Sequence, residues 1–212
     1  GFFHVRVGER VRDELYAKAF VFEHDGKRLG WVGLDLICVD ADFVQQAKAI
    51  VAKECGIAPE QLLISATHTH SGPEVRTFGA KVERNLEWLA ALPAKIATAV
   101  RQACERFQPC TLHHGMMQVP DYVYNRLYRL RDGSEVHGKG NDPDKVLGPA
   151  GDRDAELHTL ALRDKNRRLI GLTVNLGCHS CVIAGSKTNF FSKDWPGFIG
   201  ENAARFFRIP TP

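Results

Sequence analysis

A strand, a helix and a second strand are predicted early in the chain, and this order constrains the fold more than any other feature. The stretch 28–36 has strand composition, 41–54 repeats apolar residues at helical spacing, and 62–68 is a short apolar run. Asp40 stands where a helix cap is expected, and Gly56 where a helix ends. A helix between two such strands is typical of a crossover that returns to the same sheet.

The rest of the pattern adds antiparallel strands and two more helices. An Asp-Gly pair at residues 25 and 26 predicts a turn between strands at 17–24 and 28–36. The other predicted elements are helices at 82–106 and 195–207, strands at 111–119, 123–131, 156–164 and 168–177, and a long surface loop at 132–155. We therefore predict the α/β class, a layered domain with a mixed β-sheet and helices packed on it.

Composition excludes several classes of protein. The chain has 212 residues, of which 44% are hydrophobic and 25% charged, which excludes a disordered chain. Apolar runs of about ten residues are too short for the ~20 that cross a bilayer. The formal net charge is only +3, so we expect no nucleic-acid partner.

The six cysteines are too few for a disulfide scaffold. Cys178 and Cys181 form a C-x-x-C pair, which can be redox-active or part of a zinc site. The alternative is that both are small buried residues. The count leaves the compartment and the disulfide state open.

The most informative segment is Thr-His-Thr-His-Ser-Gly-Pro at 67–73, where an apolar strand ends. If the extended path continues, His68 and His70 share one face of the strand, about 6–7 Å apart. Neutral imidazole is a good zinc ligand, and a second histidine can donate a hydrogen bond to bound substrate. The alternative is two ordinary histidines at the rim of the sheet.

A second apolar strand runs into His179. Taken alone, this residue is equally well a core histidine or a ligand. Beside the first pair it becomes a candidate third member of one cluster, because catalytic zinc usually takes three protein ligands.

Three charged residues are further candidates. By strand alternation Arg126 lies on an apolar, aromatic face with Tyr124 and Tyr128, so it needs a carboxylate or another oxygen to contact. The sequence does not decide whether Arg126 forms a structural ion pair or a functional contact. Asp194 and Asp35 are candidates to support a ligand histidine, and Asp194 is alternatively a helix cap.

Several segments together resemble the N-terminal domain of the neutral/alkaline non-lysosomal ceramidase family. They are ISATHTHSGP at 64–73, NR at 125–126, NLGCHS at 175–180 and SKDWPG at 192–197, in that order. The stretch 13–36 also resembles the opening hairpin of that family.

The resemblance implies a chemistry and a set of roles. That family hydrolyses the amide bond of N-acyl sphingosines with one zinc ion. By motif, His68 and His179 resemble zinc ligands, His70 the histidine that contacts substrate or its oxyanion, and Arg126 the active-site arginine. The remaining ligands, a glutamate and a tyrosine, are expected downstream of residue 212, as is the active-site serine.

The resemblance further implies a bacterial ceramidase-like protein of sphingolipid metabolism, of which residues 1–212 are a single N-terminal catalytic domain, incomplete at both ends. We expect a lipid amide substrate, reached through peripheral membrane contact. The resemblance favours secretion or the periplasm and leaves the cytoplasm open, and it predicts no oligomeric state. The alternatives are a metal-dependent esterase, lactonase or small N-acyl amide hydrolase, and a non-catalytic metal-binding module.

Overall fold

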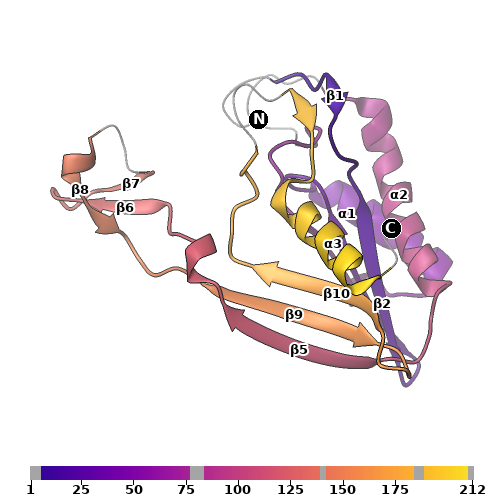
Figure 1. Cartoon of the computed structure of the whole chain (residues 1–212). Helices are drawn as coiled ribbons and strands as arrows, with labels where there is room; N and C mark the ends of the chain where they lie inside the picture. The colour runs from indigo at the N-terminus through magenta and orange to yellow at the C-terminus, as the bar shows by residue number, and fades with distance from the viewer. Residues whose placement is uncertain (1–5, 77–83, 139–141, 184–188, 210–212) are drawn as a thin grey trace. The chain divides into compact units, whose positions relative to one another are not determined.

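The computed structural model describes most of the chain, namely residues 6–76, 84–138, 142–183 and 189–209. Its residues form two compact units (Figure 1). The first unit comprises Gly1–Gln108 and His179–Pro212, and the second comprises Pro109–Cys178. That residues 1–212 form one catalytic domain stays a prediction.

The first unit is built on a mixed three-stranded sheet of β2 (Ala17–His24), β3 (Lys27–Leu34) and β4 (Leu62–Ala66). β2 pairs antiparallel with β3, and β3 pairs parallel with β4. Asp25 and Gly26 join the hairpin with φ angles of 49° and 73°, as a two-residue turn of this hand requires. The prediction of an α/β fold with a mixed sheet is confirmed.

The α-helices in the described part of the chain are α1 (Ala41–Cys55), α2 (Leu86–Cys104) and α3 (Asp194–Phe207), close to their predicted positions. Asp40 occupies the N-cap of α1, although its side chain makes no capping hydrogen bond there. Gly56 ends that helix at a φ of 65°, as predicted. None of the helices in the described residues has the length and apolarity that crossing a membrane requires. A short parallel pair, β1 (Arg10–Val11) with β11 (Phe190–Phe191), completes the unit.

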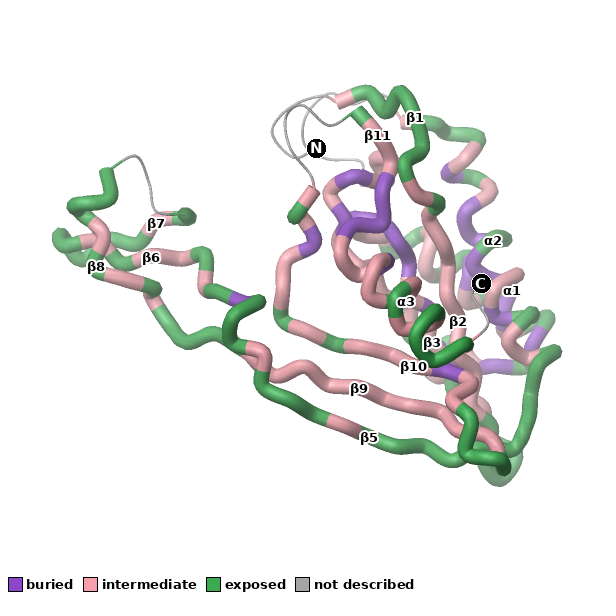
Figure 2. The backbone as a smooth tube through the Cα atoms, viewed as in Figure 1, coloured by how far each residue is buried: buried purple, intermediate pink, exposed green. Residues whose placement is uncertain are grey.

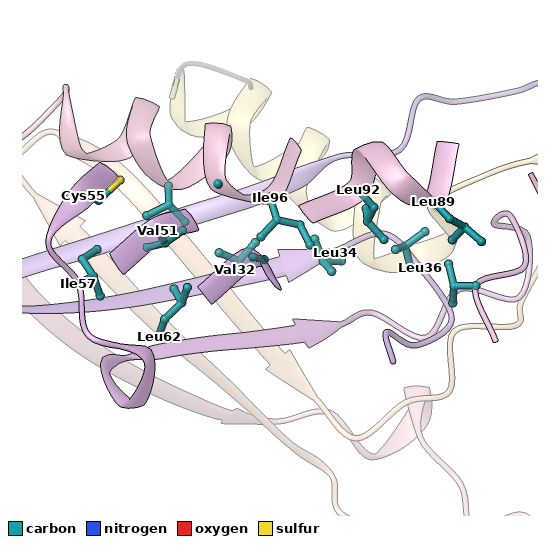
Figure 3. Packing of buried hydrophobic residues seen from close by; sticks show 14 of the residues in the cluster. Val32, Leu34, Leu36, Val51, Cys55, Ile57, Leu62, Leu89, Leu92 and Ile96 are labelled. Carbon is teal, nitrogen blue, oxygen red and sulfur yellow. The ribbon is translucent and has the colours of Figure 1, made fainter. Parts of the chain in front are cut away.

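The core of the first unit lies where α1 and α2 pack on the sheet (Figure 3). Val32 of β3, Val51 of α1 and Ile96 of α2 are each fully buried. In Figure 2 both helices carry buried segments between intermediate and exposed ones. Each such side chain contributes about 1.5–3 kcal/mol by leaving water. This core fixes β3 and β4, whose ends carry the candidate site.

Asn85 should contribute measurably to the stability of α2. Its side-chain oxygen accepts a hydrogen bond from the backbone N–H of Trp88 at 2.9 Å. We expect Asn85→Ala to lower the unfolding free energy by about 1 kcal/mol, and Asn85→Asp to preserve it, because aspartate caps equally well. Urea denaturation of both variants checks this, and an equal loss in the two would contradict the capping role. Residues 82 and 83, where the predicted helix started, lie outside the described residues.

The second unit contains two antiparallel sheets (Figure 1). One has the order β10-β9-β5 and consists of β5 (Thr111–Gln118), β9 (Glu156–Arg163) and β10 (Leu169–Leu176). The other has the order β7-β6-β8 and consists of β6 (Leu127–Leu130), β7 (Glu135–His137) and β8 (Val146–Pro149).

Two predictions for the second unit were wrong. The expected surface loop at 132–155 contains β7 and β8, which are too short to leave a clear alternating pattern. The strand expected from residue 123 begins at Leu127 instead. The side chain of Asn125 accepts the N–H of Leu127 at 2.9 Å, and this local turn interrupts an extended path.

Candidate metal centre

The carboxyl ends of β3 and β4 lie at one edge of the first sheet, and backbone hydrogen bonds extend their pairing past both ends. The N–H of Thr67 donates to the carbonyl of Leu34 at 2.9 Å, and the N–H of His68 donates to the carbonyl of Leu36 at 2.9 Å. The loop after β4 is therefore held against the segment after β3. In open α/β sheets this edge is where ligands bind.

His68 has a φ of 65°, in the left-handed region that residues other than glycine rarely adopt. The expected extended path from β4 through His68 to His70 is therefore wrong. The turn is fixed from outside the loop, because Nδ1 of His68 lies 2.8 Å from the carbonyl oxygen of Ile37. Strained conformations of this kind persist where the surroundings over-determine them, and they are common at functional sites.

His179 comes to the same place from a distant part of the sequence. The hydroxyl of its neighbour Ser180, which is 2% exposed, donates to the carbonyl of Thr67 at 2.5 Å. The N–H of His70 donates to the carbonyl of Ser180 at 3.2 Å. Two hydrogen bonds thus fasten the turn at His179 onto the loop of His68 and His70.

The three imidazoles form one cluster. Ring centroids are 4.9 Å apart for His68 and His70, 5.0 Å for His68 and His179, and 4.6 Å for His70 and His179. Each ring offers a nitrogen, and these nitrogens all lie within 4.8 Å of one another. The cluster could therefore hold a metal ion.

The electrostatics of the cluster disfavour a charged His70. Burial of the ring, together with the neighbouring His179, His68 and Arg6, lowers the pKa of His70 to about 4. At neutral pH the imidazole is therefore uncharged. An uncharged imidazole can give a lone pair to a metal or donate its single N–H to an acceptor.

The residues present fit a transition-metal ion. Nε2 of His70 lies 3.1 Å from Nε2 of His179. Two nitrogens that bind one tetrahedral zinc ion at about 2.0–2.1 Å lie about 3.4 Å apart, close to that separation. Nδ1 of His68 contacts the carbonyl of Ile37, and a contact of one ring nitrogen with a carbonyl is what orients most ligand histidines. A donor set of imidazoles suits zinc and its neighbours better than calcium or magnesium.

Asp194 is fully buried and fastens the chain that follows His179. Its carboxylate accepts the backbone N–H groups of Val182 at 3.3 Å and Ile183 at 3.2 Å. It also accepts the N–H of Trp195, whose indole donates to the carbonyl of His179 at 3.3 Å. Asp194 is the first residue of α3, and the N-cap position belongs to Lys193.

Asp35 is 1% exposed and fastens the segment that holds His68. Its carboxylate accepts two hydrogen bonds from Nζ of Lys18, at 2.8 and 3.0 Å, and one from the N–H of Tyr16 at 3.1 Å. The next residue, Leu36, accepts the N–H of His68. Asp35 thus ties that segment to β2.

Arg126 belongs to the second unit, directly before β6, and is exposed. The expectation that it lies on an apolar face with Tyr124 and is shielded from water is wrong, since Tyr124 is itself 68% exposed. The reason is the late start of β6, which removes residues 124–126 from the strand alternation. Its active-site role stays a prediction.

Arg6 is a neighbour of the cluster that the sequence did not single out. Its guanidinium donates to the carbonyl of His70 at 2.5 Å. A small pocket beside the cluster is lined by Arg6, Gly8, His70, Asn189 and Phe191, among others. A lone arginine far from any motif carries no signal in the sequence, so only the fold reveals this proximity.

Fold and site together define an α/β protein with a candidate three-histidine metal centre at the carboxyl edge of a mixed sheet. The sequence is 28% identical over 196 residues to neutral ceramidase of Pseudomonas aeruginosa. The match covers 86% of this chain and 27% of that protein. A comparison with descriptions of known protein families found no match.

Two solved ceramidase structures share the fold of this chain. A ceramidase complexed with C2 superposes with a TM-score of 0.68, and neutral ceramidase from Pseudomonas aeruginosa with a TM-score of 0.65. Each is 23% identical, and each match covers 90% of this chain and 30% of the other. The predicted resemblance to neutral ceramidases is confirmed, and the chain spans less than a third of the length of these relatives.

Proposed function

We propose that this chain carries part of the active site of a zinc-dependent hydrolase that cleaves the amide bond of an N-acyl sphingosine (ceramide) or a similar N-acyl lipid. The observation that carries the proposal is the cluster of His68, His70 and His179. Similarity to neutral ceramidase over most of the chain supports the choice of reaction. The remaining zinc ligands and the active-site serine are expected beyond residue 212.

His68 and His179 are the proposed zinc ligands. Nδ1 of His68 contacts a backbone carbonyl, and Nε2 is therefore the nitrogen proposed to bind the ion. His179 presents its Nε2 to the cluster, 3.1 Å from His70. Zinc bound in such a site polarises a carbonyl and makes water nucleophilic near neutral pH.

His70 and Arg126 are proposed to stabilise the substrate oxygen that gains negative charge as the amide carbonyl is attacked. His70 is uncharged at neutral pH, so it acts by donating one N–H to that oxygen. Arg126 donates from a permanently charged guanidinium. Each such donor is worth about 3 kcal/mol of barrier. The geometry also allows His70 as a third ligand, and the metal content of a His70 variant separates the two roles.

Asp194 and Asp35 are proposed to act through the backbone. Asp194 holds the segment after His179. Asp35 holds the segment that fixes His68. The substrate is proposed to be a lipid amide, which the protein reaches by peripheral contact with a membrane.

A substrate panel tests the proposal. The complete gene product, loaded with zinc, is assayed with an N-acyl sphingosine, a short N-acyl amide, a carboxylic ester and a lactone. We expect the highest kcat/KM for the long-chain N-acyl sphingosine. A higher kcat/KM for the ester, the lactone or the short amide would show that the substrate is not an N-acyl lipid. Zinc binding without turnover of any of the four would point to a non-catalytic metal-binding module.

A further inference from the structure

We propose that Cys181 is a positioning residue that fixes which nitrogen of His179 faces the metal ion, and that it makes metal binding sensitive to thiol oxidation. The inference rests on the proposed metal centre and extends it to the residue that orients one ligand. Its basis is a side-chain contact, because Sγ of Cys181 lies 2.6 Å from Nδ1 of His179.

The backbone holds both partners of this contact in place. The N–H of Cys181 donates to the carbonyl of His179 at 3.0 Å, and this tight turn brings the thiol back to the ring. The same carbonyl accepts the indole N–H of Trp195 at 3.3 Å. Directly after the turn, the N–H of Val182 is held by the carboxylate of Asp194. Hydrogen bonds therefore hold the backbone in place both at His179 and directly after Cys181.

The thiol and the metal cluster lie on different edges of the His179 ring. Nδ1 contacts the sulfur, whereas Nε2 lies 3.1 Å from Nε2 of His70. Among the described residues, the group whose donor atoms could share one ion consists of His68, His70 and His179, without Cys181. The sulfur is thus a partner of the ring and not a ligand in this geometry.

The contact selects a tautomer. When Nε2 of His179 gives its lone pair to an ion, the neutral ring carries its proton on Nδ1 and donates it to the sulfur of Cys181. Ligand histidines usually donate this proton to a carboxylate, a carbonyl or water. A sulfur acceptor differs from these because it can be oxidised.

Oxidation by a peroxide would break the arrangement. The thiol attacks one peroxide oxygen, an S–O bond forms, the O–O bond breaks and water leaves, so that two electrons pass from sulfur to the peroxide. The product is a sulfenic acid at Cys181. Because the sulfur already lies 2.6 Å from Nδ1, the added oxygen disturbs this contact, and we expect the His179 ring to lose the orientation that faces the cluster.

Zinc affinity, measured by chelator competition on the complete gene product, tests the proposal. We expect Cys181→Ala to weaken zinc binding about 10–100-fold, as loss of a ligand-orienting partner does. Cys181→Ser keeps an acceptor and should bind within about threefold of wild type. Hydrogen peroxide should weaken binding in the wild type and in the matched control Cys178→Ser, but leave Cys181→Ser unchanged. Nitrogen NMR of zinc-loaded protein should show the proton of His179 on Nδ1.

The results distinguish a failure of the proposed role of Cys181 from a failure of the proposed metal centre. If zinc is lost from a His179 variant but Cys181→Ala binds it as wild type does, only the role of Cys181 is overturned. Equal peroxide sensitivity in the wild type and in Cys181→Ser would also overturn it. If the histidine variants keep their zinc, the failure lies with the proposed function.

Discussion

Replacing His68 with asparagine should release the metal ion from the complete gene product while leaving its fold intact. Asparagine tolerates the left-handed φ of 65° at this position better than alanine does. Its amide can also take the place of Nδ1 and donate to the carbonyl of Ile37. It lacks Nε2, so the variant removes the ligand atom together with the ring contacts to His70 and His179.

We expect zinc content to fall from about one ion per chain to below a tenth in both His68→Asn and His179→Ala. We expect kcat/KM to fall by at least about a thousandfold, since the zinc chemistry is lost with the ion. Elemental analysis after dialysis measures the first quantity, and hydrolysis of an N-acyl sphingosine the second.

Two histidine variants serve as controls. His158→Ala removes a surface imidazole of the second unit and should keep both zinc and activity. His70→Ala should keep the zinc and lose about a hundredfold to a thousandfold in kcat, as for a lost oxyanion donor. Loss of zinc from His70→Ala would instead make His70 a third ligand. Full zinc content in both His68→Asn and His179→Ala would rule out the metal centre.

The sequence could place the histidines at strand ends, but not the turn that brings their rings together. The apolar runs before His68 predicted β4 correctly, because burial imposes the pattern on the sequence itself. The left-handed turn at His68 depends on hydrogen bonds to Leu36 and Ile37, about thirty residues earlier in the chain. Contacts of that range leave no local periodicity to detect.

The same limit explains the wrong expectation for Arg126. Alternation is a sound guide only while the chain stays extended, and the hydrogen bond that the N–H of Leu127 donates to the side chain of Asn125 delays the start of β6. For Cys181 the sequence did give a signal, because the C-x-x-C spacing is typical of redox or zinc sites. Only the three-dimensional turn shows that the thiol contacts the His179 ring.

Asp194→Ala should be among the most destabilising single substitutions outside the apolar core. The carboxylate is fully buried, and it accepts backbone N–H groups of Val182, Ile183 and Trp195 at 3.3, 3.2 and 2.6 Å. A donor left without an acceptor costs about 1–3 kcal/mol when it is fully buried, and these part-buried donors lie at the low end of that range. Alanine also carries the left-handed penalty of about 1–2 kcal/mol at the φ of 54°. We expect a total loss of about 4 kcal/mol in urea denaturation.

Two matched variants separate these causes. Asp194→Gly removes the carboxylate but carries no penalty at this φ, so it should lose less stability than alanine, about 3 kcal/mol. Asp194→Asn keeps one oxygen and tolerates the same φ, so it should lose about half as much as alanine. If Asp194→Gly were as stable as the wild type, the carboxylate would have no structural role here.

The destabilisation should also reach the metal centre, because these hydrogen bonds fix the backbone directly after Cys181 and His179. In a folded Asp194→Asn protein we expect zinc affinity to fall about tenfold, the scale seen when a ligand loses its orienting support. Asp35→Asn is the counterpart on the other segment, since Asp35 holds the chain that positions His68. If both variants lose stability but bind zinc as tightly as the wild type, the two aspartates serve the fold alone. A parallel loss of stability and affinity in both would instead mean that the ligand histidines depend on the rigidity of the two loops that carry them.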